Sequence, residues 1–109
     1  MRGVDIELDK PRKLRYDFNA VADLEDKGGL GIGAMFTEER IGFSSIRLLL
    51  WAGLKWQDKG LTLDRVGNMI QAYIEIGNDL SDLMTKITEA LALSGILGKQ
   101  GEVIAEAAN

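Results

Sequence analysis

The sequence contains no cysteine and no histidine among its 109 residues. These two residue types supply many catalytic nucleophiles, the commonest general base and most zinc ligands. Without cysteine the chain can form neither a disulfide framework nor a redox pair, so nothing in it indicates an oxidising compartment. We therefore expect a non-enzymatic protein of a reducing cytoplasm, with no catalytic residue, no metal site and no cofactor.

Long apolar runs and positive charge are also scarce. The longest nearly apolar run, Ile46 to Leu54, is interrupted by Arg47 and is far shorter than the ~20 residues that span a bilayer. The start of the chain lacks the basic-then-apolar layout of a signal peptide. The net charge of -4 disfavours nonspecific binding to nucleic acid or anionic membranes. We expect a cytoplasmic protein with neither kind of partner.

Two segments of alternating polarity open the chain. Residues 4–8 and residues 14–18 alternate between apolar and charged side chains, which is the period of a half-buried strand. The single proline, Pro11, lies between them, and because proline cannot donate a ladder hydrogen bond we place it in the turn. Acids on the first strand would meet Lys13 and Arg15 on the second. The two segments predict a β-hairpin.

A short helix is predicted over residues 17–28. A capping Asp or Asn begins it, acids occupy its early turns and a glycine follows Lys27. Helical geometry brings Phe18, Val21 and Leu24 to one side, where we expect them to pack beneath the apolar face of the hairpin.

Residues 28–42 hold five of the thirteen glycines, and we expect a loop with room for one short helical turn. Within it, Gly29, Gly31 and Ala34 fit the degenerate spacing of the dinucleotide-binding fingerprint. That motif must follow a buried strand in a parallel βαβ unit, and the chain shows no such pattern. We therefore favour a flexible loop between helices over nucleotide binding.

Three further helices are predicted after this loop. The first, from Ser44, is apolar on nearly all sides and should be the buried central helix. Thr62 is a plausible N-cap for the second, Gly77 ends it, and Asp79 or Ser81 begins the third. These elements predict an α+β fold, mainly α, with an N-terminal β-hairpin packed on a bundle of about four helices.

One compact domain is expected from the length and from a hydrophobic content of 46%. We assign residues 1–98 to this single globular domain. From Ser94 onward the helix signals weaken and the end is rich in alanine and glutamate. Residues 99–109 are therefore predicted to be a flexible C-terminal tail, either disordered or folding only on a partner.

An acidic cluster on the first helix could ligate a hard cation. It contains Asp23, Glu25 and Asp26, and carboxylate oxygens bind calcium or magnesium. No calcium-binding loop pattern surrounds these residues, however, and acids on a solvated helix face are far commoner than such sites. We favour the solvated face.

Basic residues near Tyr16 and Phe18 superficially resemble a stacking surface for nucleic acid. They alternate with core-facing residues in a predicted hairpin, and the overall charge is acidic, so a protein interface is favoured. These basic residues are Arg2, Lys10, Arg12, Lys13 and Arg15.

The two tryptophans, Trp51 and Trp56, lie five residues apart and so project from different faces of the central helix. Tryptophan is enriched at interface hot spots. We nevertheless favour a core position for Trp51 and a capping position for Trp56 at the turn between helices. Leu93, Ile96 and Leu97 would either close the core or form a docking strip.

Four segments carry a resemblance to a known family. They are Val-Asp-Ile-Glu-Leu (4–8), Lys-Leu-Arg-Tyr-Asp-Phe-Asn-Ala-Val-Ala-Asp-Leu-Glu (13–25), Ile-Arg-Leu-Leu-Leu-Trp-Ala-Gly-Leu (46–54) and Leu-Thr-Leu-Asp-Arg-Val-Gly (61–67). In this order the chain resembles the small tail assembly chaperones of long-tailed bacteriophages and prophages. In those proteins a strand leads into L-R-Y-D-x-N-A-h-x-x-L-E, where h is apolar, then an L-L-W-A-G-L helix, then L-T-x-x-x-V-G.

The resemblance implies a protein made in the cytoplasm of the infected bacterium and absent from the mature virion. It would bind the long tape measure protein, keep it soluble and help to recruit tail tube proteins around it. Some relatives carry a C-terminal extension made by ribosomal frameshifting, for which the end from Ser94 onward would be a natural attachment point. The family has no active site to transfer, and homo-oligomerisation stays open.

A chaperone of this kind needs an apolar groove rimmed by acids to receive the apolar stripe of a partner helix. We predict the protein-binding groove near Trp56, Met84, Leu93, Ile96 and Leu97. Two other functions stay open: a structural tail or head-tail connector subunit, and a regulatory domain that binds a small ligand through the glycine loop.

Overall fold

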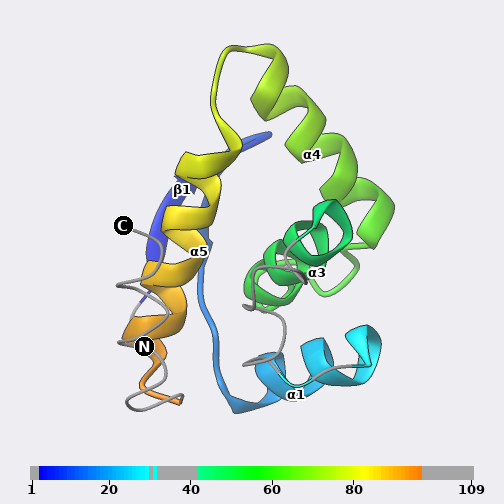
Figure 1. Ribbon diagram of the computed structural model, residues 1–109, viewed down its shortest axis with the longest axis vertical. Helices are drawn as coiled ribbons and strands as arrows, with labels where there is room; N and C mark the ends of the chain where they lie inside the picture. Colours follow the sequence, from blue (N-terminus) through cyan, green and yellow to red (C-terminus); the bar gives the residue numbers. More distant parts are fainter. Residues whose placement is uncertain (1–2, 30, 32–41, 97–109) are drawn as a thin grey trace.

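Two strands and four helices form the part of the chain that the computed structural model describes, residues 3–29, 31 and 42–96. In chain order they are β1 (Val4–Glu7), β2 (Pro11–Leu14), α1 (Phe18–Gly28), α3 (Phe43–Leu54), α4 (Leu63–Glu75) and α5 (Leu80–Ser94) (Figure 1). The fold class is α+β and mainly α, as predicted. Most of the predicted loop over 28–42, Ala34 of the glycine motif and the predicted tail over 99–109 lie outside the described residues.

The predicted hairpin is present, but its second strand is Pro11–Leu14 and not residues 14–18, so its proline lies in a strand. β1 and β2 are antiparallel, with Val4 opposite Leu14 and Glu7 opposite Pro11. The prediction that Pro11 lies in the turn is therefore wrong. Proline is tolerated as the first residue of a strand, and in a two-stranded sheet each strand has a free edge where no amide is needed. The turn itself is closed by the amide of Leu8, which donates to the carbonyl of Lys10 over 3.2 Å.

α1 begins where predicted, but Phe18 does not pack under the hairpin. The Asp17 carboxylate caps the helix by accepting a hydrogen bond from the amide of Ala20 at 2.8 Å. The buried stripe of α1 is centred on Ala20, Val21 and Leu24, and at 100° per residue Phe18 falls outside it. Its side chain is 75% exposed, so that part of the prediction is wrong.

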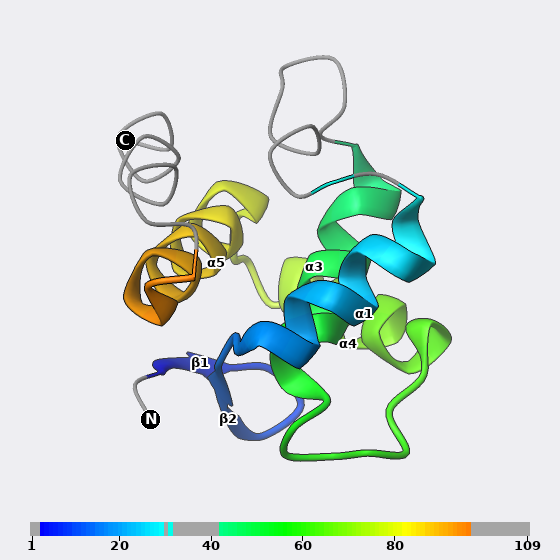
Figure 2. The same cartoon turned by 90° about the horizontal axis from the view of Figure 1, so that it is seen from below.

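α3 is the central helix, as predicted, and begins at Phe43, one residue before Ser44. It packs against α1, α4, α5 and β2, and α1 lies along one side of it (Figure 2). Leu49, Leu50 and Leu54 have no exposed surface. Because every other major element contacts this helix, its apolar circumference becomes the centre of the core.

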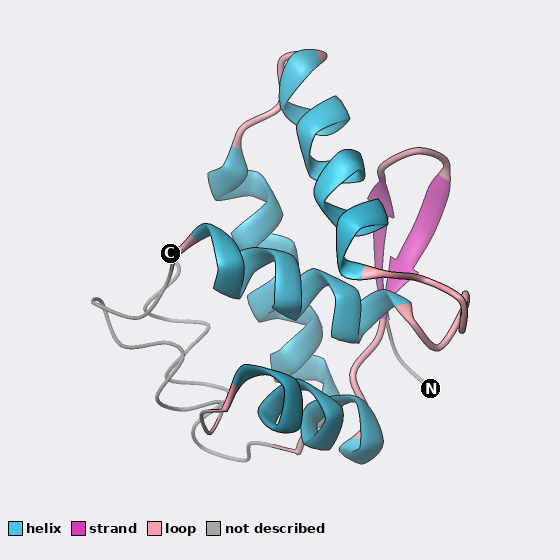
Figure 3. Cartoon of the chain, turned by 90° about the vertical axis from the view of Figure 1, so that its right-hand side faces the viewer, coloured by secondary structure: helices cyan, strands magenta, loops and turns pink. Residues whose placement is uncertain are grey.

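The two C-terminal helices start at the predicted caps. Thr62 accepts a hydrogen bond from the amide of Arg65 at 3.2 Å, and Asp79, one of the two alternatives, accepts one from the amide of Ser81 at 3.1 Å. α4 ends just before Gly77, whose φ of 101° is left-handed. α4 packs on α3, whereas α5 packs on α3 and on both strands, which lie to one side of the helices (Figure 3).

The contact between hairpin and α3 is unusually close. The amide of Arg15 donates to the carbonyl of Gly53 over 2.9 Å, and the buried Tyr16 hydroxyl donates to the carbonyl of Leu49 over 2.5 Å. These bonds join the two residues that follow β2 to the C-terminal half of α3. Among the described helices, none combines the length and the apolar character needed to cross a membrane.

Candidate functional site

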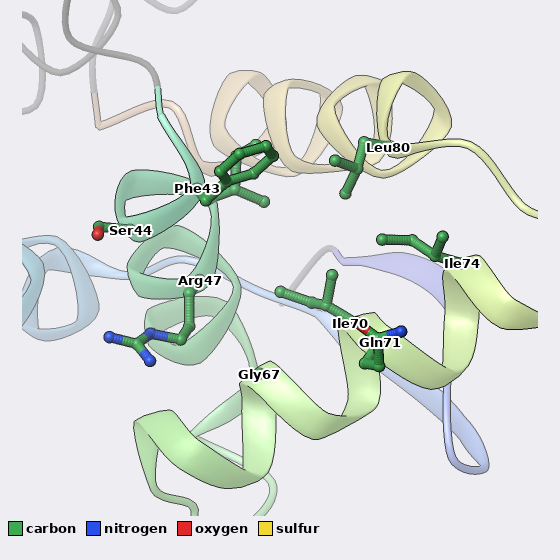
Figure 4. Close-up of a pocket in the computed structure, with 9 residues that line it drawn as sticks. Phe43, Ser44, Arg47, Gly67, Ile70, Gln71, Ile74 and Leu80 are labelled. Atoms are coloured by element: carbon green, nitrogen blue, oxygen red, sulfur yellow. The ribbon is translucent and has the colours of Figure 1, made fainter.

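An open pocket of about 360 Å³ lies between the first turns of α3, the middle of α4 and the start of α5 (Figure 4). Its walls are mainly apolar, with three polar side chains among them. The lining residues are Phe43, Ser44, Ile46, Arg47, Gly67, Ile70, Gln71, Ile74 and Leu80.

α4 forms one wall because its apolar surface is wider than α3 can cover. Val66, Met69 and Tyr73 form a buried stripe. Ile70 and Ile74 lie next to that stripe, rotated toward the pocket, and they stay partly exposed. Val66, Ile70, Tyr73 and Ile74 recur at helical spacing on one apolar side of α4. The fold divides that side into a packed half and an open half.

The other two walls also present apolar side chains. Phe43, in the first turn of α3, is 81% exposed and its ring points toward Leu80 in Figure 4. Leu80 is the first residue of α5 and is half-buried. Ile74 is 41% exposed, and Ile76, just beyond α4, is 78% exposed. Several large apolar residues exposed around one hollow indicate a binding site more strongly than a single exposed residue does.

The charges around the pocket are unevenly distributed. Arg47 lies on the α3 wall, away from the end at which α4 leads into α5 (Figure 4). At that junction the Gln71 amide donates to the Glu75 carboxylate over 2.9 Å. Burial raises the pKa of Tyr73, and the nearby carboxylates of Asp82 and Asp79 raise it further. Among the described residues that line the pocket, Arg47 alone is charged. Acids flank the opposite end, since Glu75 directly follows the lining residue Ile74 and accepts a hydrogen bond from the lining residue Gln71, and Asp79 directly precedes Leu80.

Four of the five residues predicted to form a groove are described, and none of these four lines this pocket. Met84 is half-buried on α5, and Leu93 and Ile96, at the end of that helix, are 41% and 36% exposed. Nine residues separate Met84 from Leu93, so at 100° per residue they lie on opposite sides of α5. Leu97 lies outside the described residues. Whether any of them contacts a partner stays a prediction.

Trp56 occupies a structural position at the junction between hairpin and helix. Its indole N–H donates to the carbonyl of Lys13 over 3.0 Å, and the guanidinium of Arg15 lies 4.7 Å from the ring centre. Trp56 follows the end of α3, but its printed hydrogen bond goes to the hairpin, so a cap of the turn between helices stays a prediction. Trp51 is half-buried, not fully in the core, and its indole N–H donates to the carbonyl of Leu61 over 3.0 Å.

Several predicted charged candidates pair with each other. Asp23, from the acidic cluster of α1, forms an ion pair with Lys55. In the hairpin Lys13 lies 3.5 Å from Asp5, its register partner, as the predicted cross-strand pairing requires. Arg2 lies outside the described residues. Within residues 3–29, 31 and 42–96 there is no group of three potential metal-ligating side chains.

The lining of the pocket offers apolar contacts with a few polar groups, and the sequence patterns indicate little of its position. Phe43 precedes the predicted start of the central helix, and Ile70 and Ile74 share one apolar side of α4 with residues that the fold buries. A usable signal was the width of the apolar stripe of α4, which exceeds what one neighbouring helix covers. Comparison of the chain with protein-family models, curated proteins and solved structures gave no match.

Proposed function

We propose that this protein is a phage tail assembly chaperone that binds the tape measure protein, keeps it soluble and helps to recruit tail tube proteins during tail morphogenesis. The observation that carries the proposal is the open apolar pocket between α3, α4 and α5, with Phe43 and Ile74 exposed at its walls. The resemblance of four segments, which together cover β1, most of α1 and α3 and the start of α4, supplies the family. The protein would act in the host cytoplasm and be absent from the virion.

A holding protein needs an apolar surface that stays open until its client arrives. Covering one large apolar side chain contributes about 1.5–3 kcal/mol, so a few such contacts give reversible binding after the cost of association. An amphipathic helix fits this geometry because residues at i, i+3 and i+4 can enter a groove between helices. Long helical clients such as tape measure proteins present many such stripes.

A small apolar ligand is the second candidate, favoured by the pocket volume. About 360 Å³ is within the range of ~300–1,000 Å³ for small-molecule sites. Such sites normally enclose their ligand, whereas Phe43 on the wall of this pocket is 81% exposed. We therefore rank the protein client first.

Co-expression with the proteins encoded beside this chain tests the proposal. We expect a soluble complex with a very long helical protein that aggregates when produced alone, and no copy of the chaperone in purified virions. Lack of binding to any neighbour, together with retention of the chain in particles, would instead identify a structural tail or connector subunit. Stoichiometric binding of a small molecule without a protein client would favour the ligand-binding alternative.

A further inference from the structure

The described fold does not require glycine at one position that lines the pocket. Gly67 lies inside α4, where glycine is less favourable than alanine by about 1 kcal/mol. Its φ is not positive, since the positive-φ glycines among the described residues are Gly29, Gly77 and Gly95. A Cβ at position 67 would meet only the Cδ of Arg47, at an ordinary contact distance of 3.5 Å. Neither backbone conformation nor packing among the described residues therefore requires glycine there.

Gly53 of α3 provides the contrast. A Cβ at that position would come within 2.8 Å of both Leu14 and Tyr16. That glycine is required because the hairpin packs directly on the helix backbone. Gly67 leaves the backbone of α4 equally bare, but it faces the open pocket instead of another element. A bare stretch of helix allows a second helix to approach toward the lower end of the usual 8–10 Å interaxial distance.

We propose that a client helix crosses α4 at Gly67, inserts a large apolar side chain beside Ile70, and places basic residues against the acidic end of the pocket. This inference rests on the proposed function and specifies how the same site recognises its client. The apolar side chain would fill the hollow between Ile70 and Phe43. Gly67 sets how closely the two helices approach.

The charge pattern selects the client. Glu75 and Asp79 flank the lining residues Ile74 and Leu80 in the sequence, and the Glu75 carboxylate accepts a hydrogen bond from the lining residue Gln71 at 2.9 Å. Arg47 is on the opposite wall. A client helix with Lys or Arg at one end of its apolar stripe and Asp or Glu at the other complements this pattern in one orientation only. The site therefore favours one direction of the client helix.

The test compares substitutions at position 67 with a matched control on the same helix. Gly67→Leu fills the space that the client would occupy, and Gly67→Ala fills part of it. Ala72→Leu introduces the same side chain at an exposed position on the other side of α4. The tape measure protein is purified as the co-expressed complex, and the wild-type chain in that complex is then exchanged for each variant. The affinity of each variant for the tape measure protein is measured, together with the melting temperature of the free variant.

We expect Gly67→Leu to fold and to bind at least about tenfold more weakly, which is about 1.4 kcal/mol. Gly67→Ala should melt at or above the wild-type temperature and still bind more weakly. Ala72→Leu should bind within about twofold of wild type, because single surface changes rarely alter more than this. Wild-type affinity in Gly67→Leu would overturn the inference while leaving the chaperone function intact, whereas failure of the wild type to bind at all would refute the function itself.

The salt dependence of binding tests the proposed charge complementarity separately. Glu75→Lys should weaken binding severalfold at low salt, and the difference from wild type should shrink at high salt because the screening length falls. Glu75 is exposed and its carboxylate bonds the lining residue Gln71, so the variant should retain its fold while reversing a charge beside the pocket. Equal or tighter binding by Glu75→Lys at low salt would contradict the assigned orientation.

Discussion

Gly53 of α3 lies directly against the ring of Tyr16, close enough that a Cβ at Gly53 would be 2.8 Å from the tyrosine Cζ. The Tyr16 hydroxyl donates to the carbonyl of Leu49, one turn earlier in the same helix, over 2.5 Å. The segment following the hairpin is thus fixed on α3 by one close steric fit and one buried hydrogen bond. Both contacts can be tested separately.

Gly53→Ala should destabilise the protein, although alanine is the better helix former. The added methyl group would displace Tyr16 or Leu14, and overpacking of this kind costs about 1–3 kcal/mol. Gly67→Ala is the matched control and should stabilise the protein by up to about 1 kcal/mol. Chemical denaturation of both variants measures whether each substitution lowers or raises the free energy of unfolding. Similar stability changes for both would show that the hairpin does not pack on α3 at this distance.

Tyr16→Phe should lower stability by about 0.5–1.5 kcal/mol, because it removes the hydrogen bond to Leu49 without changing the ring. Burial also raises the pKa of Tyr16. A raised folded-state pKa means that the stabilisation is fully present below the unfolded value near pH ~10 and is lost as pH rises above it. Wild type should therefore lose stability in alkali more steeply than Tyr16→Phe. Parallel alkaline unfolding curves would contradict this.

Asp9→Asn should destabilise the hairpin because Arg12 is 4% exposed and its guanidinium bonds the Asp9 carboxylate at 2.6 and 2.9 Å. Leaving a buried cation without its counter-charge costs about 1–3 kcal/mol. The double variant Asp9→Asn/Arg12→Met should recover part of the loss, since it removes both charges. A double variant no more stable than Asp9→Asn would show that the pairing is not the cause.

The same pair predicts acid sensitivity. The hydrogen bond from Arg12 holds the pKa of Asp9 below its usual value. A lowered folded-state pKa means that the stabilisation is present above about pH 4 and is lost as pH falls through the folded value. Wild type should lose more stability on acidification than the double variant Asp9→Asn/Arg12→Met, measured by denaturation at a series of pH values. Equal losses in both proteins would assign the acid sensitivity to other groups.

Phe43→Ser should weaken client binding while changing the free energy of unfolding by no more than about 0.5 kcal/mol, because the ring is 81% exposed. Phe18→Ser is the control, since Phe18 is 75% exposed but lies outside the pocket. Binding titrations and denaturation curves of the two variants distinguish a site residue from a merely exposed one. Equal loss of binding in both would place the client elsewhere.

The sequence alone was sufficient for the features that depend on neighbours along the chain. Asp17, Thr62 and Asp79 cap their helices through amides two or three residues away, so a local pattern identifies them. The apolar circumference of residues 46–54 likewise identified the central helix. Fold class follows from these elements, because each strand and helix has to bury its apolar side against another.

Only the tertiary structure decided which apolar side chains remain outside. Phe18 and Ile74 resemble core residues in the sequence, yet one lies off the buried stripe of α1 and the other on the half of α4 that α3 does not cover. Periodicity shows that a face is apolar but not how much of it a neighbour covers, because coverage depends on where distant helices lie. The pocket exists for that reason: α3 packs against α4 on Val66, Met69 and Tyr73 and leaves the adjacent stripe open.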